Sequence, residues 1–399
     1  MRRVVRELPI EVAGFRFGAA ACGIKPSRRP DCGLIVAEEP AAAGAVFTRN
    51  RFAAAPVEIG RERLRAGRLQ ALFVNSGNAN ACTGRRGLAD ARRICGLLGR
   101  EMGVPPGLVA PLSTGVIGVP LPMPKLGRGV VAAVRSARTD GVWRFANAIR
   151  TTDAFSKVTT EVVRVGGRRV RVVGIAKGAG MIAPDMATLL VFVLTDARLS
   201  PAQARWLAAQ VAGGSFNDLT VDGDTSTNDS LYVLASGRAG HGPVRRSQLG
   251  GLRDAAVSVG DQLARMVALD GEGATKAVEL TVSGARSAAD ARQVAEAVSR
   301  SLLVKTAFHG ADPNWGRIAC AVGYSRARFE PSRVSIWIDD VQVFRRGAGV
   351  AGAAARARRK MLREEFSVRI SLGTGLGRAR RITSDLSPAY VRFNSAYTT

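Results

Sequence analysis

Thr188 is the residue of this chain with the clearest capacity for chemistry. It follows a loop of small residues and proline and begins an apolar run, in the segment KGAGMIAPDMATLLVF at residues 177–192. If the Ala187–Thr188 bond were cut, Thr188 would carry both a nucleophilic hydroxyl and an α-amine able to act as its base. The segment therefore suggests a self-activated N-terminal nucleophile. A plain loop-to-strand junction is the alternative that the residues alone leave open.

The loop before Thr188 has residue types that suit backbone strain. Gly178 and Gly180 can adopt conformations closed to other residues, and Pro184 fixes one dihedral angle. In a strained loop the Thr188 hydroxyl can attack the Ala187 carbonyl and convert the amide to an ester, which water then splits. The expected cleavage site is the Ala187–Thr188 bond.

Other catalytic arrangements have little support in the sequence. The two histidines, His241 and His309, lie far apart and outside any GxSxG context, which argues against a serine or cysteine triad. His309 is interpreted as a structural imidazole beside the segment GADPNWGR. No His, Asp or Glu cluster has the spacing of metal ligands, so no metal site is predicted.

Apolar runs predict the strands that would hold Thr188 in place. These runs are residues 69–77, 168–177, 188–196, 230–237, 277–285 and 332–340. The run TLLVFVL lacks polar alternation, so both of its faces must be covered, most simply by helices on either side of packed sheets. The prediction is a mixed α/β (α+β) fold.

Two helices between these strands have clear start signals. Ser200 is a hydroxyl N-cap before Pro201 in the segment SPAQARWLAAQVAGG, which ends in glycine. Ser287 and Asp290 have a spacing like that of a capping box at the start of the second helix. One face of that helix is expected to be lined by Ala291, Val294, Val298 and Leu302.

The net charge of +26 and pI near 11.4 raise the question of nucleic-acid binding. Arginines are spread along the whole chain, and the densest runs, ARARRK at 355–360 and RARR at 378–381, have no interleaved aromatic residues. Nucleic acid is therefore not an expected partner. A basic surface can still concentrate small carboxylate substrates.

Cysteine usage indicates a reducing compartment. Five scattered cysteines without paired spacing fit free thiols in a cytoplasm better than a disulfide framework. The N-terminal segment lacks the apolar region of a signal peptide, and no run of about 18 apolar residues is present. The expectation is a cytoplasmic protein without membrane contact.

Several longer motifs occur in a characteristic order. They are NSGNANACTG at 75–84, STGVIG at 113–118, TTD at 151–153, TVDGDTSTND at 220–229, DGEGATK at 270–276, GADPNWGR at 310–317 and the terminal FNSAYTT. With these motifs the chain resembles the ornithine acetyltransferases, or glutamate N-acetyltransferases, of arginine biosynthesis (the ArgJ family). The resemblance runs from FTRNRFAAAPV at 47–57 to the last residue.

The resemblance implies a helix–sheet–sheet–helix architecture of the DmpA/ArgJ-like type with a smaller C-terminal α/β lobe at about 285–385. Cleavage would give an α chain of residues 1–187 and a β chain of residues 188–399. These chains would stay together, as a heterotetramer of two of each. No cofactor is implied, and whether acetyl-coenzyme A also serves as acetyl donor is left open.

The resemblance also assigns site residues. Thr188 would be the nucleophile, with Thr114 and Gly115 as the oxyanion hole. Lys177 is suited to the substrate carboxylate or to polarity near the nucleophile, and Glu272 to an amine, either that of Thr188 or that of ornithine. The remaining implied substrate contacts are Thr151 or Thr152, Asn394 and Thr399. The segments NSGNANACTG and TVDGDTSTND are interpreted as walls of the site.

The implied reaction moves an acetyl group from N-acetylornithine to glutamate through an acetyl-Thr188 ester. The alternative is an N-terminal-nucleophile aminopeptidase or amidase of related fold, which would pass the acyl group to water. A noncatalytic basic nucleic-acid-binding protein is the more distant rival. One segment departs from the family pattern, because relatives usually carry an aromatic residue and a cysteine at the positions of Ile382 and Ser384.

Overall fold

The computed structural model describes residues 7–183, 189–240 and 242–396. These residues form two compact units. The first unit comprises residues 7–217 and 224–263, and the second comprises residues 218–223 and 264–396. The predicted lobe at about 285–385 lies within the second unit. Each unit has its own sheet and its own hydrophobic core.

The first unit is built on a sheet that has eight strands among the described residues. Its strands are β1 (Phe15–Ala20), β2 (Cys32–Phe47), β3 (Arg68–Asn78), β4 (Val109–Val116), β5 (Lys157–Val165), β6 (Arg168–Lys177), β7 (Leu190–Thr195) and β9 (Ser230–Ala235). Its helices are α1 (Ala55–Arg63), α2 (Gly84–Met102), α3 (Met123–Arg135), α4 (Val142–Ala148), α5 (Pro201–Gly214) and most of α6 (Leu249–Leu269). The strand order is β4-β3-β2-β9-β7-β6-β5, with β1 paired to β2.

The long strand β2 divides this sheet into two halves. Its first part pairs with β1 and β3, and its last part, Ala42–Phe47, pairs with β9. The register of β2 with β3 shifts between Val36 and Ala41, and the residues between them include Pro40, which cannot donate a ladder hydrogen bond. The strand can therefore belong to two sheet halves that pack face to face.

One core lies between the two halves. It joins Phe17 of β1 and Phe192 of β7 through Phe145 of α4. The ring centroids of Phe17 and Phe145 are 6.2 Å apart, and those of Phe145 and Phe192 are 5.2 Å apart in an edge-on arrangement. Burying each ring contributes about 2–3 kcal/mol. This core fixes the strand that follows Thr188.

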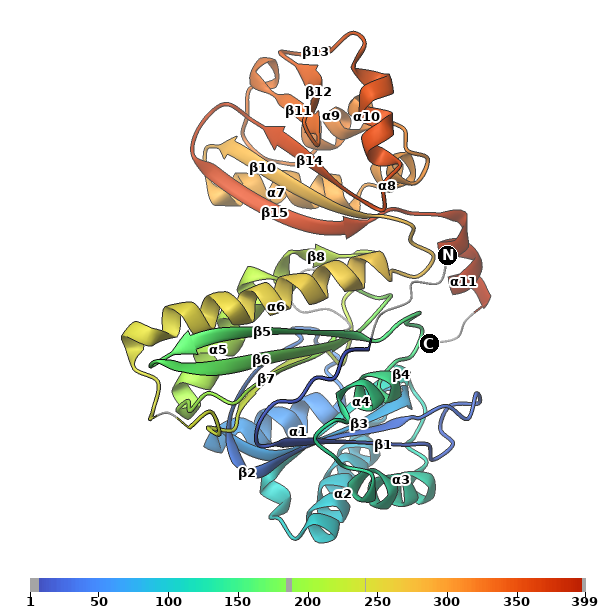
Figure 1. Ribbon diagram of the computed structural model, residues 1–399. Coiled ribbons are helices and arrows are strands. Elements are labelled where there is room, and N and C mark those ends of the chain that lie inside the picture. The colour runs from blue at the N-terminus through green and yellow to red at the C-terminus, as the bar shows by residue number, and fades with distance from the viewer. Residues whose placement is uncertain (1–6, 184–188, 241, 397–399) are drawn as a thin grey trace. The chain divides into compact units, whose positions relative to one another are not determined.

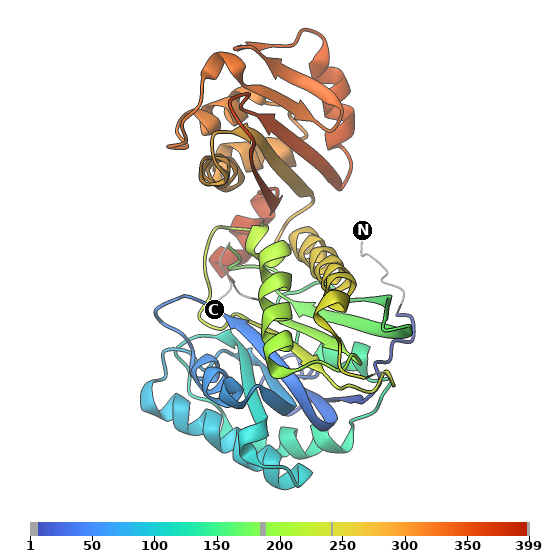
Figure 2. The same cartoon turned by 90° about the vertical axis from the view of Figure 1, so that its left-hand side faces the viewer.

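Helices cover the two outer faces. On one side, side chains of α1, α2 and α3 pack on β2 and β3. On the other, α5 lies on β2 and β9, and α6 lies on β6, where Gly174 leaves room for Val259. Helices α5 and α6 lie side by side (Figures 1 and 2). The predicted helix–sheet–sheet–helix layering is confirmed. Strand β7 is covered by helices on one face and by the other half of the sheet on its second face.

The second unit has a sheet of seven strands among its described residues. They are β8 (Leu219–Thr220), β10 (Ala277–Ala285), β11 (Ser335–Ile338), β12 (Val341–Arg345), β13 (Ala348–Gly349), β14 (Glu365–Ser371) and β15 (Gly377–Ser384), in the order β13-β12-β11-β14-β10-β15-β8. Its helices are α7 (Ala288–Arg300), α8 (Leu302–His309), α9 (Trp315–Gly323), α10 (Ala353–Met361) and α11 (Pro388–Ala396).

The local start signals in the sequence are largely confirmed. Ser200 and Gln203 form a capping box at the start of α5, and Ser287 accepts the Asp290 N–H at the start of α7. The prediction that Leu302 lies on the buried face of α7 is wrong. The helix ends at Arg300, and Ser301 adopts an extended conformation and caps the new helix α8, so Leu302 is 67% exposed.

The predicted strand at 332–340 is shorter than expected. It forms β11 at Ser335–Ile338, because Pro331–Arg333 makes a 3-10 turn and Asp339 has a φ of 50°. Over the ranges that the structure describes, no helix is both long enough and apolar enough to cross a membrane.

Candidate active site

Three predicted site residues fall outside the described ranges: Ala187, Thr188 and Thr399. The structure nevertheless defines the residue that follows Thr188. The N–H of Leu189 donates to Asp229 Oδ1 at 2.7 Å, and its carbonyl accepts the Ser230 N–H at 2.9 Å. Both bonds tie the beginning of the β7 segment to the start of β9.

Lys177 and Thr114, two predicted site residues 63 positions apart, meet inside the first unit. Lys177 ends β6 and Thr114 lies near the end of β4, and they are 2% and 4% exposed. Lys177 Nζ donates to Thr114 Oγ1 at 3.2 Å. Because a hydroxyl has one donor and two acceptor positions, accepting from Lys177 leaves the Thr114 O–H able to donate elsewhere.

Asp153, the last residue of the TTD motif, holds the ammonium groups of this cluster. Its Oδ1 lies 2.8 Å from Lys157 Nζ and its Oδ2 lies 3.9 Å from Lys177 Nζ, and the Gly178 N–H donates to Oδ1 at 2.6 Å. Burial opposes ionisation of Asp153. The charges of Lys157 and Lys177, with these hydrogen bonds, outweigh it and hold the pKa of Asp153 well below its usual value.

The predicted substrate contacts Thr151 and Thr152 lie in the same neighbourhood. Both are half-buried, in the turn between α4 and β5. The Thr151 N–H donates to Asp153 Oδ2 at 3.0 Å. The TTD segment is therefore attached to the carboxylate that also faces Lys177.

Gly115, the second predicted member of the oxyanion hole, has a φ of 131°, which favours glycine. It lies opposite Gly77 in the parallel pairing of β3 and β4. A Cβ atom at Gly115 would come within 2.3 Å of the Gly77 carbonyl carbon. The close approach of two main chains requires glycine at this position.

Two motifs interpreted as site walls support the end of β4. From NSGNANACTG, Asn75 Oδ1 accepts the Ser113 hydroxyl at 2.6 Å. From TVDGDTSTND, Asn228 Nδ2 donates to the Ser113 carbonyl at 2.9 Å and to the Ala79 carbonyl at 2.7 Å. These bonds fix the backbone immediately before Thr114.

Asp229 is a further candidate active-site residue. It ends the motif TVDGDTSTND, whose composition did not distinguish it from the other polar residues. It is fully buried and accepts from Leu189, next to the predicted nucleophile. Burial raises the pKa of Asp229 well above its usual value, although the Leu189 N–H and the charge of Lys177 act in the opposite direction. Among the described residues its Oδ2 has no hydrogen-bond partner.

Glu272 belongs to the second unit, in the loop of the DGEGATK motif, and is half-buried. The Ser387 hydroxyl donates to the Gly273 carbonyl at 2.6 Å. At Gly273, whose φ is 69°, a Cβ atom would come within 2.4 Å of the Tyr390 nitrogen. The loop that carries Glu272 is thus packed on the start of α11.

Asp385 holds the other end of that loop. Its Oδ1 accepts the N–H groups of Thr275 and Lys276 at 2.8 and 3.0 Å, and its Oδ2 accepts the Thr275 hydroxyl at 2.6 Å. His309 Nδ1 lies 2.8 Å from the same Oδ2. The Thr275 hydroxyl and the Asp385 carboxylate both face Nδ1 of His309. In a nucleophilic triad the hydroxyl and the carboxylate face different nitrogens of the imidazole ring, so Thr275, His309 and Asp385 do not form one. His309 has the structural contact expected of it.

Asn394 lies on α11 and is exposed. Its Nδ2 donates to the Tyr390 carbonyl one turn earlier at 3.2 Å. The first unit therefore groups Thr114, Gly115, Lys177 and the TTD segment, whereas Glu272 and Asn394 belong to the second unit.

Ser384, one of the two positions near the C-terminus that depart from the family pattern, accepts hydrogen bonds from a buried lysine. Ser384 accepts from Lys305 Nζ through its carbonyl and, at 3.3 Å, through its hydroxyl, and Thr383 Oγ1 accepts at 3.1 Å. Ile382 is buried at 1% exposure. The serine hydroxyl thus takes part in satisfying a buried ammonium group, and the positions before α11 are well packed.

Lys305 should make stability depend on pH in a defined direction. Burial lowers its pKa from 10.5 to about 8, against the attraction of Asp385. Between pH 8 and 10.5 the unfolded chain binds more protons than the folded one, so this residue makes stability rise with pH. Relative to Lys305→Met, wild type should gain about 2 kcal/mol from pH 7.5 to 9.5 in urea unfolding followed by tryptophan fluorescence.

The matched control for Lys305 is Lys360→Met, because the Lys360 side chain is 38% exposed and pairs with Asp340 on the surface. Its pH dependence should follow that of wild type. Equal slopes for wild type and Lys305→Met would mean that the ammonium of Lys305 is not held at a lowered pKa.

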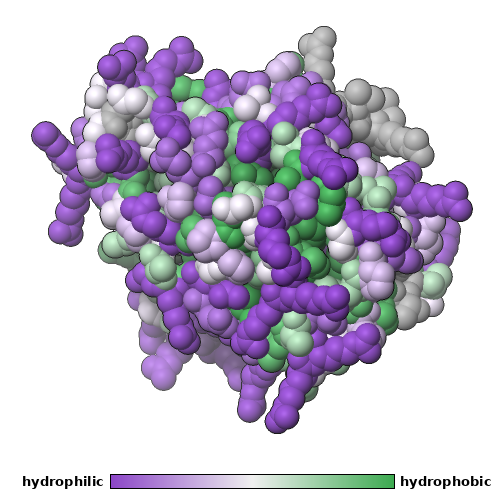
Figure 3. Space-filling view, turned by 90° about the horizontal axis from the view of Figure 1, so that it is seen from below, coloured by the Kyte–Doolittle hydropathy of each residue, from purple (hydrophilic) through white to green (hydrophobic). Residues whose placement is uncertain are grey.

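The basic residues are spread along the whole chain. Figure 3 shows hydrophilic side chains distributed across the face that it presents, with small hydrophobic areas between them. Several surface arginines pair with carboxylates, including Arg300 with Glu296 and Arg253 with Asp254. This distribution favours a solvated surface as the explanation of the charge.

Comparison with known proteins gives consistent results. A sequence model described as the ArgJ family matches residues 16–399. The arginine biosynthesis bifunctional protein ArgJ of Geobacter sulfurreducens is 46% identical over 394 residues, which cover 98% of this chain and 100% of the relative. The protein of the same name from Syntrophotalea carbinolica is 46% identical over 395 residues, with coverage of 98% and 100%.

A solved structure with a similar chain is that of ornithine acetyltransferase complexed with ornithine from Mycobacterium tuberculosis. It is 38% identical, the match covers 47% of this chain and 99% of that chain, and the TM-score is 0.40.

Proposed function

This chain belongs to the ArgJ family, and from that premise we propose that it transfers the acetyl group of N2-acetyl-L-ornithine to L-glutamate, with L-ornithine and N-acetyl-L-glutamate as products. It is an enzyme of arginine biosynthesis that acts on small molecules. The support for this activity is identity of 46% over 98% of the chain with a curated member of the family. The reaction itself requires a nucleophile, a base and an oxyanion hole.

In the proposed mechanism the chain first cleaves itself between Ala187 and Thr188. The Thr188 hydroxyl attacks the Ala187 carbonyl, the acyl group moves from nitrogen to oxygen, and water hydrolyses the ester. The new α-amine of Thr188 then serves as the base for its own hydroxyl. The observation that carries this proposal is the buried Lys177–Thr114 contact at the end of β6, where the segment leading to Thr188 begins.

Acetyl transfer then proceeds in two steps. Thr188 Oγ attacks the acetyl carbonyl of N-acetylornithine, the Thr188 amine takes the hydroxyl proton and gives it to the departing ornithine amine, and the C–N bond breaks. The glutamate amine next attacks the acetyl ester and gives a proton to the Thr188 amine. The C–O bond breaks, and the Thr188 amine passes that proton to Thr188 Oγ. We propose that the Thr114 hydroxyl and the Gly115 N–H stabilise the oxyanion in both steps.

The other assigned residues would bind substrate. Lys177 would provide positive charge near the nucleophile or for a carboxylate, and Glu272 would attract an amine. Thr151 or Thr152, Asn394 and Thr399 would complete the contacts. No cofactor enters the scheme. Because its relatives are called bifunctional, we further propose that acetyl-coenzyme A can donate the acetyl group to glutamate.

We propose that residues 1–187 and 188–399 remain associated after cleavage as α and β chains, in a heterotetramer of two of each, in the cytoplasm. The pairing of β6 with β7 supports the association of the two chains. These strands lie on opposite sides of the cut and pair from Val172 with Thr195 to Lys177 with Leu190. The core between the sheet halves also includes side chains from both chains.

Steady-state kinetics test the proposed function. Initial rates measured over a grid of N-acetylornithine and glutamate concentrations should give the parallel double-reciprocal lines of a ping-pong mechanism. The amidase alternative predicts acetate release that is independent of glutamate. If acetate forms at the full rate without glutamate and no N-acetylglutamate appears, the transfer reaction is wrong and the amidase alternative is right.

Thr114→Ala should lower kcat by about 10²-fold, because one oxyanion donor contributes about 3 kcal/mol to the transition state. The KM for N-acetylornithine should change little, since the hydroxyl acts on charge that develops only after attack. Thr114→Ser is the matched control, because it keeps a hydroxyl and should retain most of the activity. A Thr114→Ala enzyme with wild-type kcat would remove Thr114 from the mechanism.

A further inference from the structure

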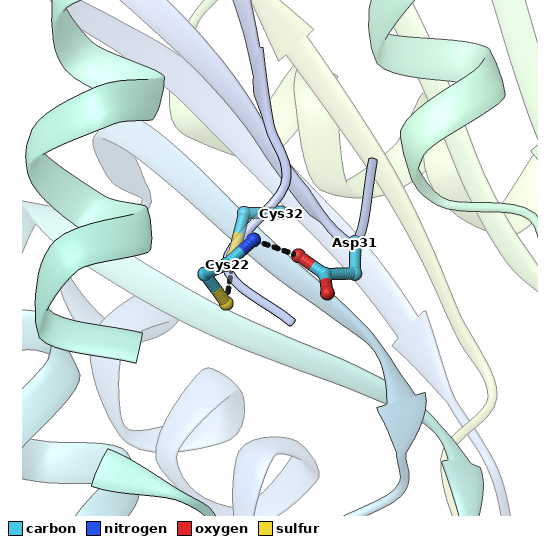
Figure 4. A group of neighbouring side chains, drawn as sticks. All are labelled: Cys22, Asp31 and Cys32. Atoms are coloured by element: carbon cyan, nitrogen blue, oxygen red, sulfur yellow. Dashed lines mark hydrogen bonds between the residues drawn. The ribbon is translucent and has the colours of Figure 1, made fainter. Parts of the chain in front are cut away.

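Two cysteines that the mechanism does not use face each other in the first unit (Figure 4). Cys22 follows β1 and Cys32 begins β2, and their Sγ atoms are 3.4 Å apart. Antiparallel pairing of Ala20 with Cys32 holds the two ends of the intervening loop together. A disulfide has an S–S distance of about 2.05 Å, so the sulfurs need to approach by only about 1.4 Å to form one.

The surroundings keep the pair together and leave one side open. Cys32 is fully buried, whereas Cys22 is partly exposed. Helix α3 passes over both residues at Gly129, where a Cβ atom would come within 2.6 Å of Cys32 Sγ and 3.1 Å of Cys22 Sγ. A dissolved reagent therefore reaches Cys22 first, and Cys32 is next to it.

Asp31 is close enough to the two sulfurs to suggest a metal site, but its carboxylate has another role. Its Oδ1 accepts the Cys22 N–H at 2.7 Å, and its Oδ2 accepts the N–H groups of Gly23, Ile24 and Lys25 at 3.0, 2.6 and 3.2 Å. These four bonds organise the turn after β1. With the carboxylate committed to the turn, two sulfurs alone form an incomplete zinc site.

We propose that Cys22 and Cys32 form a reversible disulfide, a covalent modification site for low-molecular-weight disulfides such as oxidised glutathione. Cys22 attacks one sulfur of the reagent, which releases one glutathione and leaves a mixed disulfide on Cys22. Cys32 then attacks the Cys22 sulfur and releases the second glutathione. The two protein thiols are oxidised, and the reagent is reduced to two thiols, so the electrons balance.

The attack of Cys32 on the mixed disulfide should be slower than the first attack, by Cys22, near neutral pH. The contact with Cys22, together with burial, raises the pKa of the Cys32 thiol well above its usual value. Because only the thiolate attacks, closure of the disulfide should accelerate about tenfold per pH unit below that pKa. Loss of the mixed disulfide should follow this pH dependence.

The loop between Cys22 and Cys32 is connected to the candidate active site within the first unit. The Asp31 carbonyl accepts the Ser76 N–H at 2.8 Å, and Ser76 lies opposite Thr114 in the β3–β4 pairing. Ile24 and Lys25 pack against Gly77, the neighbour of Gly115. Closing a loop of about ten residues should raise the Tm of the protein by about 2–4 °C.

The test uses the whole protein and oxidised glutathione, followed by acid quenching, alkylation of free thiols and tryptic peptide mapping. Arg28 lies between the two cysteines, so trypsin separates them unless a disulfide joins their peptides. Cys82 and Cys320 are exposed and report single glutathione addition. Cys95 is buried, which raises its pKa to about 11, and it should stay unmodified.

The expected result is a linked Cys22–Cys32 peptide pair that reductant separates. Cys32→Ser should stop at glutathione on Cys22, and Cys22→Ser should leave Cys32 unmodified and show no rise in Tm on oxidation. A wild-type protein that retains glutathione on Cys22 without the linked pair, or in which neither cysteine reacts while Cys82 and Cys320 do, overturns the proposal. Neither result depends on acetyl transfer, so the proposed function is tested separately.

Discussion

The Thr188→Ala protein is expected to remain a single uncleaved chain and to lose acetyl transfer by at least about 10⁴-fold, since removal of a covalent nucleophile typically costs this much or more. Without the hydroxyl, nothing attacks the Ala187 carbonyl, and no α-amine is released to act as the base. The measurements are the intact mass under denaturing conditions, N-terminal sequencing and the rate of N-acetylglutamate formation. Wild type should give two fragments, the second beginning at Thr188.

Thr188→Ser is the matched control, because serine keeps a hydroxyl and can attack the same carbonyl, although the methyl group that limits its rotamers is lost. It should cleave and transfer acetyl groups at a reduced rate. If Thr188→Ala is cleaved at the same bond, or stays whole and transfers acetyl groups at the wild-type rate, the assigned nucleophile is wrong.

Asp153→Asn should destabilise the protein by about 3–5 kcal/mol, because it removes the carboxylate charge next to the buried ammonium of Lys157. The carboxylate and Lys157 are both fully buried as side chains and lie 2.8 Å apart. The urea midpoint at pH 7 should fall accordingly. Activity should fall as well, since Lys177 lies 3.9 Å from the same carboxylate and donates to Thr114.

The pH dependence of Asp153 has a definite sign. Its folded pKa is depressed, so its contribution to stability is present above the unfolded pKa near 3.8 and is lost as the pH falls below that value. Asp153→Asn should therefore lose less stability than wild type on acidification from pH 5 to 3. Equal acid sensitivity of the two proteins would show that Asp153 is not ionised in the fold.

Two further variants show whether the loss of stability in Asp153→Asn comes from the lost charge pair or from the amide side chain itself. Asp153→Asn combined with Lys157→Met removes both buried charges and should recover much of the lost stability, because an unpaired charge costs more than an absent pair. Asp340→Asn, which breaks the exposed pair with Lys360, should change stability little. A double variant as unstable as Asp153→Asn alone would mean that the new amide, rather than the remaining charge of Lys157, is the cause.

Local signals in the sequence predicted much of the first unit. The apolar run at 168–177 coincides with β6, and the Ser200–Pro201 signal marks the start of α5. Both depend on interactions among neighbouring residues. The helix prediction failed at Leu302. Ser301 ends α7 and caps α8, and composition alone does not decide between one continuous helix and two helices.

The candidate site was predicted unevenly. Thr114, Gly115, Lys177 and the TTD motif were named from motifs, and the structure groups them. Asp153, Asp229 and Asp385 were not given roles, although Asp153 and Asp229 each end a named motif. These residues matter because of the groups that donate hydrogen bonds to their carboxylates, such as the Leu189 N–H at Asp229. Such partners come from other parts of the chain, so the spacing within a motif does not reveal them.

The sequence by itself determined the family, the layered α/β class and the helix start signals, and it named the candidate residues for acyl-transfer chemistry. Only the tertiary structure decided that Lys177 donates to Thr114 across 63 positions, that Asp153 holds two lysines, and that Cys22 faces Cys32. Caps and apolar periods act within a few residues, so they can be identified along the chain. Strand pairing between distant segments sets which polar groups are buried together, and burial in turn sets their charges and hydrogen bonds.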